Sequence, residues 1–218
     1  MKEKMIPFSG PMVRAIMSGK KTQTRRIINA NLDSRPPYTI RDNGYVWSAY
    51  MTQQWTRGGR ALKCPFGNVG DRLFVKEGIE GRNDTKLHDG EQMPITAYSA
   101  DGSHIWDGPK RLPWRWKPKS LPSIYMPKEL CRIKLDITNV RIERLQEITP
   151  NDAINEGCCP ENGNEWDKPE IYRKAAEIVG GPFPRGVFAM LWNQINGEES
   201  WKSNPYVWVI EFKKVVAS

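Results

Sequence analysis

The sequence predicts an α+β protein built on a small β-sheet or barrel, with helices inserted between its strands. Two segments alternate apolar and polar residues over the length of a long strand: residues 131–145, "CRIKLDITNVRIERL", and residues 205–215, "PYVWVIEFKKV". Two other stretches, at about 29–60 and 78–122, are rich in Gly, Pro, Asn and aromatic residues and show no sustained period. We therefore expect a single domain over residues 1–218, with flanking helices and long inserted loops at those two stretches.

The N-terminal part predicts one helix and one strand. In residues 11–19, "PMVRAIMSG", apolar side chains recur at helical spacing behind a proline, and Gly19 stands where a helix would end. In residues 70–78, "GDRLFVKEG", a glycine turn precedes a short apolar run, which indicates a buried strand. Lys76 and Glu77 then stand at the exit of this strand.

The C-terminal part supplies the two long strands and three helices. The alternation in residues 131–145 shifts near Thr138, which predicts a β-bulge. Residues 149–157, "TPNDAINEG", combine a threonine and a proline at the start of a helix with a glycine at its end. Residues 169–181 and 186–197 predict two further helices.

Composition narrows the classes of protein. Of the 218 residues, 39% are hydrophobic and 27% are charged, as in soluble globular proteins, and no run approaches the roughly 18 to 20 apolar residues of a membrane helix. The N-terminus has no secretory signal, so we expect a cytoplasmic protein with no membrane partner. The net charge of +8 favours an anionic partner, nucleic acid first, although a generally basic surface would also explain it.

Cysteine and histidine residues do not predict a metal site. The cysteines show no CxxC spacing, and the two histidines are far from them in the sequence. The residues concerned are Cys64, Cys131, Cys158, Cys159, His88 and His104. We interpret the cysteines as reduced thiols and expect neither a metal nor a cofactor.

The first candidate site is the basic segment of residues 18–26, "SGKKTQTRR". It places four basic side chains around two threonines, with no acidic residue. Such a segment either binds phosphate or contributes to a catalytic site. A lysine held near other cations can act as a base, and a neighbouring threonine hydroxyl can then become a nucleophile. Lys21 and Thr24 would share one side of a helical turn or a bend, but not of a straight strand.

The second candidate site is the segment of residues 106–119, "WDGPKRLPWRWKPK", in which cations alternate with tryptophans. Its cations and aromatic residues are Lys110, Arg111, Arg115, Lys117, Lys119, Trp106, Trp114 and Trp116. Cations bind phosphate and aromatic rings stack on unpaired bases, so Arg115, Trp116 and Lys117 are candidates for binding single-stranded RNA. The alternative is a loop stiffened by prolines, whose tryptophans anchor it to the core.

The order of several motifs resembles the ASCH domain family, whose members are relatives of the PUA-like RNA-binding barrels. The motifs are "GKKTQTRR", "GDRLFVKE", "ITPNDAINEG" and "YVWVIEF". The whole chain looks like the longer ASCH-type proteins that bacteriophages and prophages encode. The resemblance implies a small β-barrel with a basic, polar cleft for RNA or nucleotides, in a protein of the bacterial cytoplasm. Small bacterial ASCH proteins similar to this chain are N4-acetylcytidine amidohydrolases.

The resemblance also implies a catalytic set. The lysine, threonine and glutamate positions of the amidohydrolases fall on Lys21, Thr24 and Glu156. By this resemblance Thr24 attacks the acyl carbon and Lys21 accepts its proton. Glu156 then orients the lysine or carries a proton to the leaving amine. This chemistry needs no metal.

Further residues belong to the predicted cleft, and other functions compete with the enzymatic one. Candidates for holding the substrate are Lys20, Arg25, Arg26 and Glu77. The chain is roughly twice the length of the family core, so its insertions could cover the cleft or enlarge it for a polymer. The alternatives are a non-catalytic module that binds single-stranded RNA and a phage accessory or morphogenesis protein that acts through protein contacts. In either case Lys21 and Glu156 could form a buried ion pair that only stabilises the fold.

Overall fold

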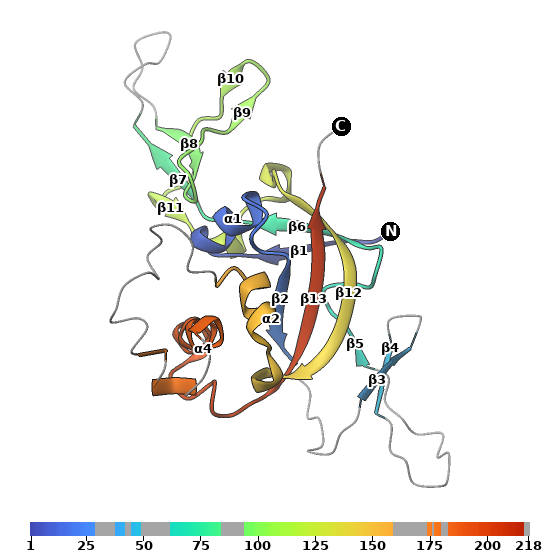
Figure 1. Cartoon of the computed structure of the whole chain (residues 1–218). Coiled ribbons are helices and arrows are strands. Elements are labelled where there is room, and N and C mark those ends of the chain that lie inside the picture. Colours follow the sequence, from blue (N-terminus) through green and yellow to red (C-terminus); the bar gives the residue numbers. More distant parts are fainter. Residues whose placement is uncertain are drawn as a thin grey trace, which may run out of the picture.

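A mixed five-stranded sheet forms the centre of the molecule (Figure 1). The computed structural model describes residues 1–28, 38–41, 45–48, 62–83, 94–158, 174–175, 177–179 and 183–215. The strand order is β1-β6-β12-β13-β2, in which β1 and β6 are parallel and every other pair is antiparallel. The strands are β1 (Glu3–Pro7), β2 (Gln23–Ile27), β6 (Arg72–Lys76), β12 (Lys134–Arg144) and β13 (Tyr206–Lys214).

The two long strands that the sequence predicted, β12 and β13, are confirmed and pair along almost their whole length. Their register shifts between Ile137 and Asn139, so the predicted bulge near Thr138 is also present. A bulge adds one residue to one strand and increases its bend. The pair is therefore curved, and the rest of the sheet follows this curvature (Figure 1).

The helices lie beside this sheet and begin and end close to where the sequence predicted. They are α1 (Gly10–Met17), α2 (Pro150–Asn155) and α4 (Phe183–Asn196). The Thr149 hydroxyl accepts a hydrogen bond from the Asp152 amide, and the Asp152 carboxylate accepts one from the Thr149 amide, which forms a capping box at the start of α2. Residues 174–175 and 177–179 are helical. The remainder of the helix predicted over 169–181 lies outside the described residues.

The edges of the main sheet approach each other. β1 and β2 are its outer strands, and no described backbone pairing joins them. The side chain of Arg26 in β2 nevertheless donates a hydrogen bond from Nη2 to the carbonyl oxygen of Pro7 in β1, at 2.7 Å. One arginine side chain thus spans the gap. The structure confirms the α+β class, with a strongly curved sheet whose described strands do not close.

The stretch at 78–122 contains β-structure, where the sequence predicted long loops. Strands β7 (Ile79–Arg82), β8 (Ile95–Tyr98) and β11 (Ser120–Leu121) form a sheet in the order β11-β7-β8, and β9 (Trp106–Asp107) pairs with β10 (Lys110–Arg111) in a hairpin. These strands have only two to four residues, too few to produce a visible period. The loop prediction was therefore wrong for the described part of this stretch.

The stretch at 29–60 is described only in part. Strands β3 (Tyr38–Arg41) and β4 (Tyr45–Ser48) pair with β5 (Leu62–Lys63) in a second three-stranded sheet. The other residues of this predicted insertion lie outside the described ranges, as do His88 and Cys159. Short 3-10 helices occur at Ser123–Tyr125, Lys128–Leu130 and Leu145–Glu147.

Three apolar clusters stabilise these layers. One joins α1 to the main sheet through residues such as Val13, Leu73 and Ile210. A second joins α4 to β13 and α2, and a third lies beneath the stretch at 78–122, around Ile79 and Met126. Cys64 and Cys131 are buried free thiols, and burial raises the pKa of each to about 11. In the part of the chain that the structure describes, no helix has the length and apolarity to cross a membrane.

Candidate functional site

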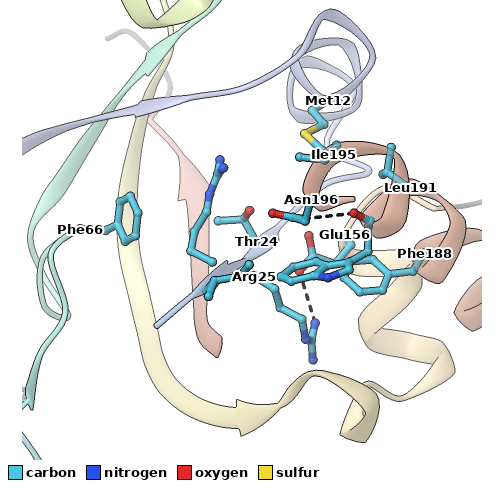
Figure 2. Close-up of a pocket in the computed structure, with 12 residues that line it drawn as sticks. Met12, Thr24, Arg25, Phe66, Glu156, Phe188, Leu191, Ile195 and Asn196 are labelled. Carbon is cyan, nitrogen blue, oxygen red and sulfur yellow. Dashed lines mark hydrogen bonds and ion pairs between the residues drawn. The ribbon is translucent and has the colours of Figure 1, made fainter. Parts of the chain in front are cut away.

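A pocket of about 310 Å³ lies between the edge strand β2 and helix α4 (Figure 2). Side chains of β2 form one wall and side chains of α4 face them. The lining residues are Thr24, Arg25, Arg26 and Ile27 of β2, Phe188, Leu191, Trp192, Ile195 and Asn196 of α4, and Met12, Phe66 and Glu156. Pockets that bind small molecules usually have volumes of about 300–1,000 Å³ and mix apolar walls with a few polar groups. This pocket fits that description at the small end.

Lys21 and Glu156 form a buried ion pair behind this pocket. The Lys21 amine donates hydrogen bonds to the Glu156 carboxylate Oε2 at 2.7 Å and to the Glu156 carbonyl oxygen at 2.8 Å. None of the Lys21 side chain is exposed and only 4% of the Glu156 side chain is. The two residues also form an antiparallel backbone bridge. The end of α2 is thus attached directly to the basic segment.

The turn after α2 makes this close contact possible. Gly157 has φ = +90°, a conformation that glycine adopts without strain, and it ends the helix as the sequence predicted. A β-carbon at this position would lie 3.4 Å from the Lys21 β-carbon and 3.2 Å from that of Ala15. Gly157 therefore lets Glu156 and Lys21 meet.

Arg25 connects the pair to further carboxylates. Its guanidinium lies 3.3 Å from Glu156 Oε1, 2.8 Å from Glu143 Oε2 and 3.4 Å from Asp152 Oδ2, and its side chain is fully buried. The contact with Glu156 is visible as a dashed line in Figure 2. Transfer of a charge out of water is costly unless partners surround it. Three carboxylates meet this requirement for Arg25, so its first role is to hold the pocket wall together.

Arg26 has a different environment. It lines the pocket, is half-buried, and its guanidinium lies over the Phe8 ring at 5.2 Å from the centroid. Among the described residues no carboxylate lies within ion-pair distance of it, and its hydrogen bond goes to the Pro7 carbonyl. Burial lowers the pKa of Arg26, and the more distant charge of Glu156 acts in the opposite direction. Arg26 is therefore a cation at the cavity without a direct anionic partner in the described protein.

Thr24 faces the cavity with an available hydroxyl. The residue is 3% exposed, lines the pocket, and its hydroxyl makes no hydrogen bond to another described residue. Lys21 pairs with Glu156 in an isolated backbone bridge, and the regular strand β2, which carries Thr24, begins two residues later at Gln23. Thr24 and Glu156 both line the cavity. Lys21 lies behind Glu156 and is not part of the lining.

Two other predicted cleft residues lie elsewhere. Lys20 is exposed and does not line the pocket. Glu77 is fully buried and accepts hydrogen bonds from both Nε and Nη2 of Arg132, at 2.9 and 2.8 Å. Burial raises the pKa of Glu77, and the hydrogen bonds and charge of Arg132 oppose this. Glu77 therefore belongs to a separate ion pair at the end of β6.

The segment of residues 106–119 lies apart from the pocket lining. Arg115 and Lys117 are exposed, but Trp116 is half-buried, lies 4.8 Å from the Trp114 ring and packs against the third apolar cluster. Trp106 in the β9–β10 hairpin is 57% exposed, and the Arg111 guanidinium is 5.5 Å from its ring centroid. Trp116 thus anchors the segment, and Trp106 presents a ring to solvent.

Sequence reasoning missed the α4 wall of the pocket. Phe188, Leu191 and Trp192 have the spacing of an ordinary buried helix face, and that pattern does not distinguish a pocket wall from a core. Ile195 is 55% exposed although it continues the same apolar face, and it also lines the pocket. An apolar face that extends beyond the core was the available signal.

Comparisons with known proteins do not place the chain in a family. No family model matches it, and no curated protein matches it. A solved structure titled "Crystal structure of hypothetical protein PH0355" aligns over 99% of this chain and 100% of its own, with 12% sequence identity and a TM-score of 0.36. A TM-score of this size does not establish a common fold.

Proposed function

We propose that the chain is an ASCH-type protein that binds an N4-acylated cytidine in this pocket and hydrolyses its amide without a metal. One observation carries the proposal: Thr24 and Glu156 face the same cavity, and the buried amine of Lys21 is 2.7 Å from the Glu156 carboxylate. A nucleophile, a base and a residue that orients the base are the parts that such a hydrolysis needs. The resemblance in sequence assigned these three roles to the same residues.

The proposed reaction proceeds through an acyl intermediate. Thr24 Oγ attacks the acyl carbon, and the hydroxyl proton passes to Lys21 by way of Glu156, which lies at the cavity surface. The bond between the acyl carbon and N4 then breaks, and the amine leaves with the proton taken from Thr24, which returns from Lys21 through Glu156 at the cavity surface. Water hydrolyses the threonine ester and restores Thr24. The short hydrogen bond between Lys21 and Glu156 provides the route by which the lysine exchanges its proton with the pocket.

The shape of the molecule supports the PUA-like part of the proposal. A small barrel requires a sheet whose edge strands come together. Here β1 and β2 approach closely enough for Arg26 to bind the Pro7 carbonyl. Helix α1 connects the two edge strands, and its residue Met12 contributes to the pocket beside β2.

Turnover of N4-acetylcytidine tests the proposal. We expect wild type to release cytidine, and Thr24→Ala to lower kcat by roughly 100-fold or more, the usual size of an effect on acid–base or nucleophilic groups. Thr22→Ala is the matched control, because Thr22 is exposed in the same segment and does not line the pocket. Lys21→Ala and Glu156→Ala should abolish turnover without adding to the loss in Thr24→Ala. The proposal fails if wild type hydrolyses no acylated cytidine, or if Thr24→Ala is as active as Thr22→Ala.

A second candidate function is non-catalytic binding of single-stranded RNA, and Trp106 is the observation that favours it. Its exposed ring lies on the β9–β10 hairpin, within a segment of residues 106–119 that has five basic residues and one acidic residue. Exposed rings among cations are the usual means of holding unpaired bases. Under this function Trp106→Ala would weaken RNA binding, and Thr24→Ala would leave RNA binding unchanged.

A further inference from the structure

The walls of the pocket contain N–H groups that have no acceptor. Three buried donors without a hydrogen-bond partner belong to lining residues: Arg25 Nε, Arg26 Nε and Trp192 Nε1. Buried polar atoms in folded proteins nearly always have partners, so unpaired ones at a cavity often mark the place of a missing ligand, ion or water. Three such atoms show that the polar side chains of this wall are not fully paired within the described protein.

None of these three donors pairs with the carboxylate of the described lining. Glu156 supplies the carboxylate of the lining, and its two oxygens are already used: Oε2 binds Lys21 and Oε1 binds Arg25. Arg25 itself is surrounded by Glu143, Asp152 and Glu156. The charges around Arg25 are therefore locally compensated, whereas the charge of Arg26 is not.

Arg26 is the side chain that can meet an anion in the cavity. It is partly exposed at the lining, and Phe8 covers one face of its guanidinium. Arg26 donates one N–H to the Pro7 carbonyl. Other N–H groups of its planar guanidinium remain for a second acceptor. A guanidinium binds the oxygens of phosphate through two parallel hydrogen bonds.

We propose that the pocket takes its cytidine as a phosphate ester, with Arg26 binding the phosphate. This inference rests on the proposed function for the cytidine, because phosphate is the anionic group that accompanies a nucleoside in a nucleotide or in RNA. The phosphate is either the monoester of a free nucleotide or the diester of an RNA chain. Both present the same oxygens to Arg26.

The experiment compares three probes by calorimetric titration: cytidine, cytidine 5′-monophosphate and a trinucleotide with a central cytidine. Hydrogen bonds to charged groups contribute enough to change affinity by about 10- to 100-fold. We expect wild type to bind the monophosphate or the trinucleotide at least about ten-fold more tightly than cytidine. Arg26→Gln should remove this preference, so that the three probes bind with similar affinity, and Arg26→Lys should keep part of it.

Arg82→Gln is the matched control, because it removes the same charge from a residue that does not line the pocket and pairs with Glu80. It should keep the full preference. Preference for the monophosphate assigns the site to free nucleotides, and preference for the trinucleotide alone assigns it to RNA. The wild-type comparison needs no variant, so it remains decisive even if Arg26→Gln fails to fold.

Equal affinity of wild type for cytidine and for both phosphate-containing probes would overturn the inference. So would a preference that persists in a folded Arg26→Gln protein. The proposed function is judged separately, by release of acetate from N4-acetylcytidine and from its 5′-monophosphate. Turnover of the two at equal kcat/KM would retain the amidohydrolase and reject the phosphate site. Arg26-dependent binding of cytidine 5′-monophosphate without any turnover would retain the phosphate site and reject the amidohydrolase.

Discussion

The two basic segments of the chain are both rich in cations but differ in environment. In residues 18–26, the side chains of Lys21 and Arg25 are fully buried and contact carboxylates. In residues 106–119, Arg115 and Lys117 are exposed. The first segment continues into an edge strand of the main sheet, and the second includes the β9–β10 hairpin (Figure 1).

This difference shows that a run of basic residues in a sequence can form either buried ion pairs or an exposed basic surface. A buried cation needs anionic partners, and the loss of one partner leaves an uncompensated charge. An exposed cation contributes little to folding but attracts polyanions through a field that salt weakens. Residues 18–26 should therefore respond to mutation through stability and chemistry, and residues 106–119 through binding.

The largest effect on stability is expected from Glu156→Ala. The change removes the carboxylate that contacts both Lys21 and Arg25 and leaves the Lys21 charge buried without an ion pair. Breaking a buried pair in this way costs about 3–5 kcal/mol in the free energy of unfolding. Urea denaturation measures it, and Glu129→Ala, which removes a carboxylate from a short helix outside this network, is the control. A loss below about 1 kcal/mol would be no larger than the contribution of an exposed ion pair. It would show that the two segments do not differ in their effect on stability.

A smaller loss is expected from Trp116→Ala. The Trp116 ring packs on Trp114 and on the third apolar cluster, but it is only half-buried. We expect a loss of about 1–3 kcal/mol, below the range of about 3–5 kcal/mol for fully buried tryptophans. Trp106→Ala is the matched variant, because Trp106 is largely exposed, and its stability should stay within about 0.5 kcal/mol of wild type. Equal losses in the two variants would show that both rings anchor the segment.

Acid should act on the first segment through Asp152. Burial by itself raises the pKa of Asp152, but hydrogen bonds from Thr149 and Gln23 and the charge of Arg25 lower it overall. A carboxylate with a lowered pKa in the folded state stabilises the protein fully above its unfolded pKa of about 3.9, and loses this contribution as the pH falls through the folded pKa. Asp152→Asn should therefore cost about 1 kcal/mol at neutral pH.

The difference in unfolding free energy between wild type and Asp152→Asn should shrink as the pH falls below about 4. Denaturation at a series of pH values measures it. Asp107→Asn in the exposed hairpin is the control and should change stability little at any pH. A difference that stays constant with pH would mean that Asp152 acts through its shape or its helix cap and not through its charge.

Where the sequence showed a period or an end signal, it predicted the fold well. The alternation of β12 and β13, the bulge near Thr138 and the capping of α2 by Thr149 were all visible in the residues, because each depends on local chemistry. The two-residue strands β9 and β10 were not visible, since they are defined by pairing with each other and not by any period of their own. Long-range pairing is the information that a single sequence expresses least directly.

The sequence indicated some residues of the pocket but not their arrangement. The motifs indicated Lys21, Thr24 and Glu156, and the structure brings Glu156 against Lys21 although 135 residues separate them. The position of Glu77 in a different ion pair could not be predicted, because its partner Arg132 is remote in sequence. Likewise, the packing of Trp116 and the exposure of Trp106 depend on which ring reaches the third apolar cluster. The sequence alone therefore does not distinguish Trp116 from Trp106.

The smallest effect on stability is expected from the double change Arg115→Ala with Lys117→Ala. Both side chains are exposed, so the free energy of unfolding should change by less than about 0.5 kcal/mol. If this segment contacts RNA, the same change should weaken binding of a single-stranded oligonucleotide. Each lost phosphate contact should reduce the slope of log affinity against log salt by about 0.7. A titration at several salt concentrations measures the slope, and a melt of the same sample measures the stability. Unchanged affinity at low salt would show that the exposed cations do not contact RNA, and the second candidate function would then lose its phosphate-binding residues while the pocket remained untouched.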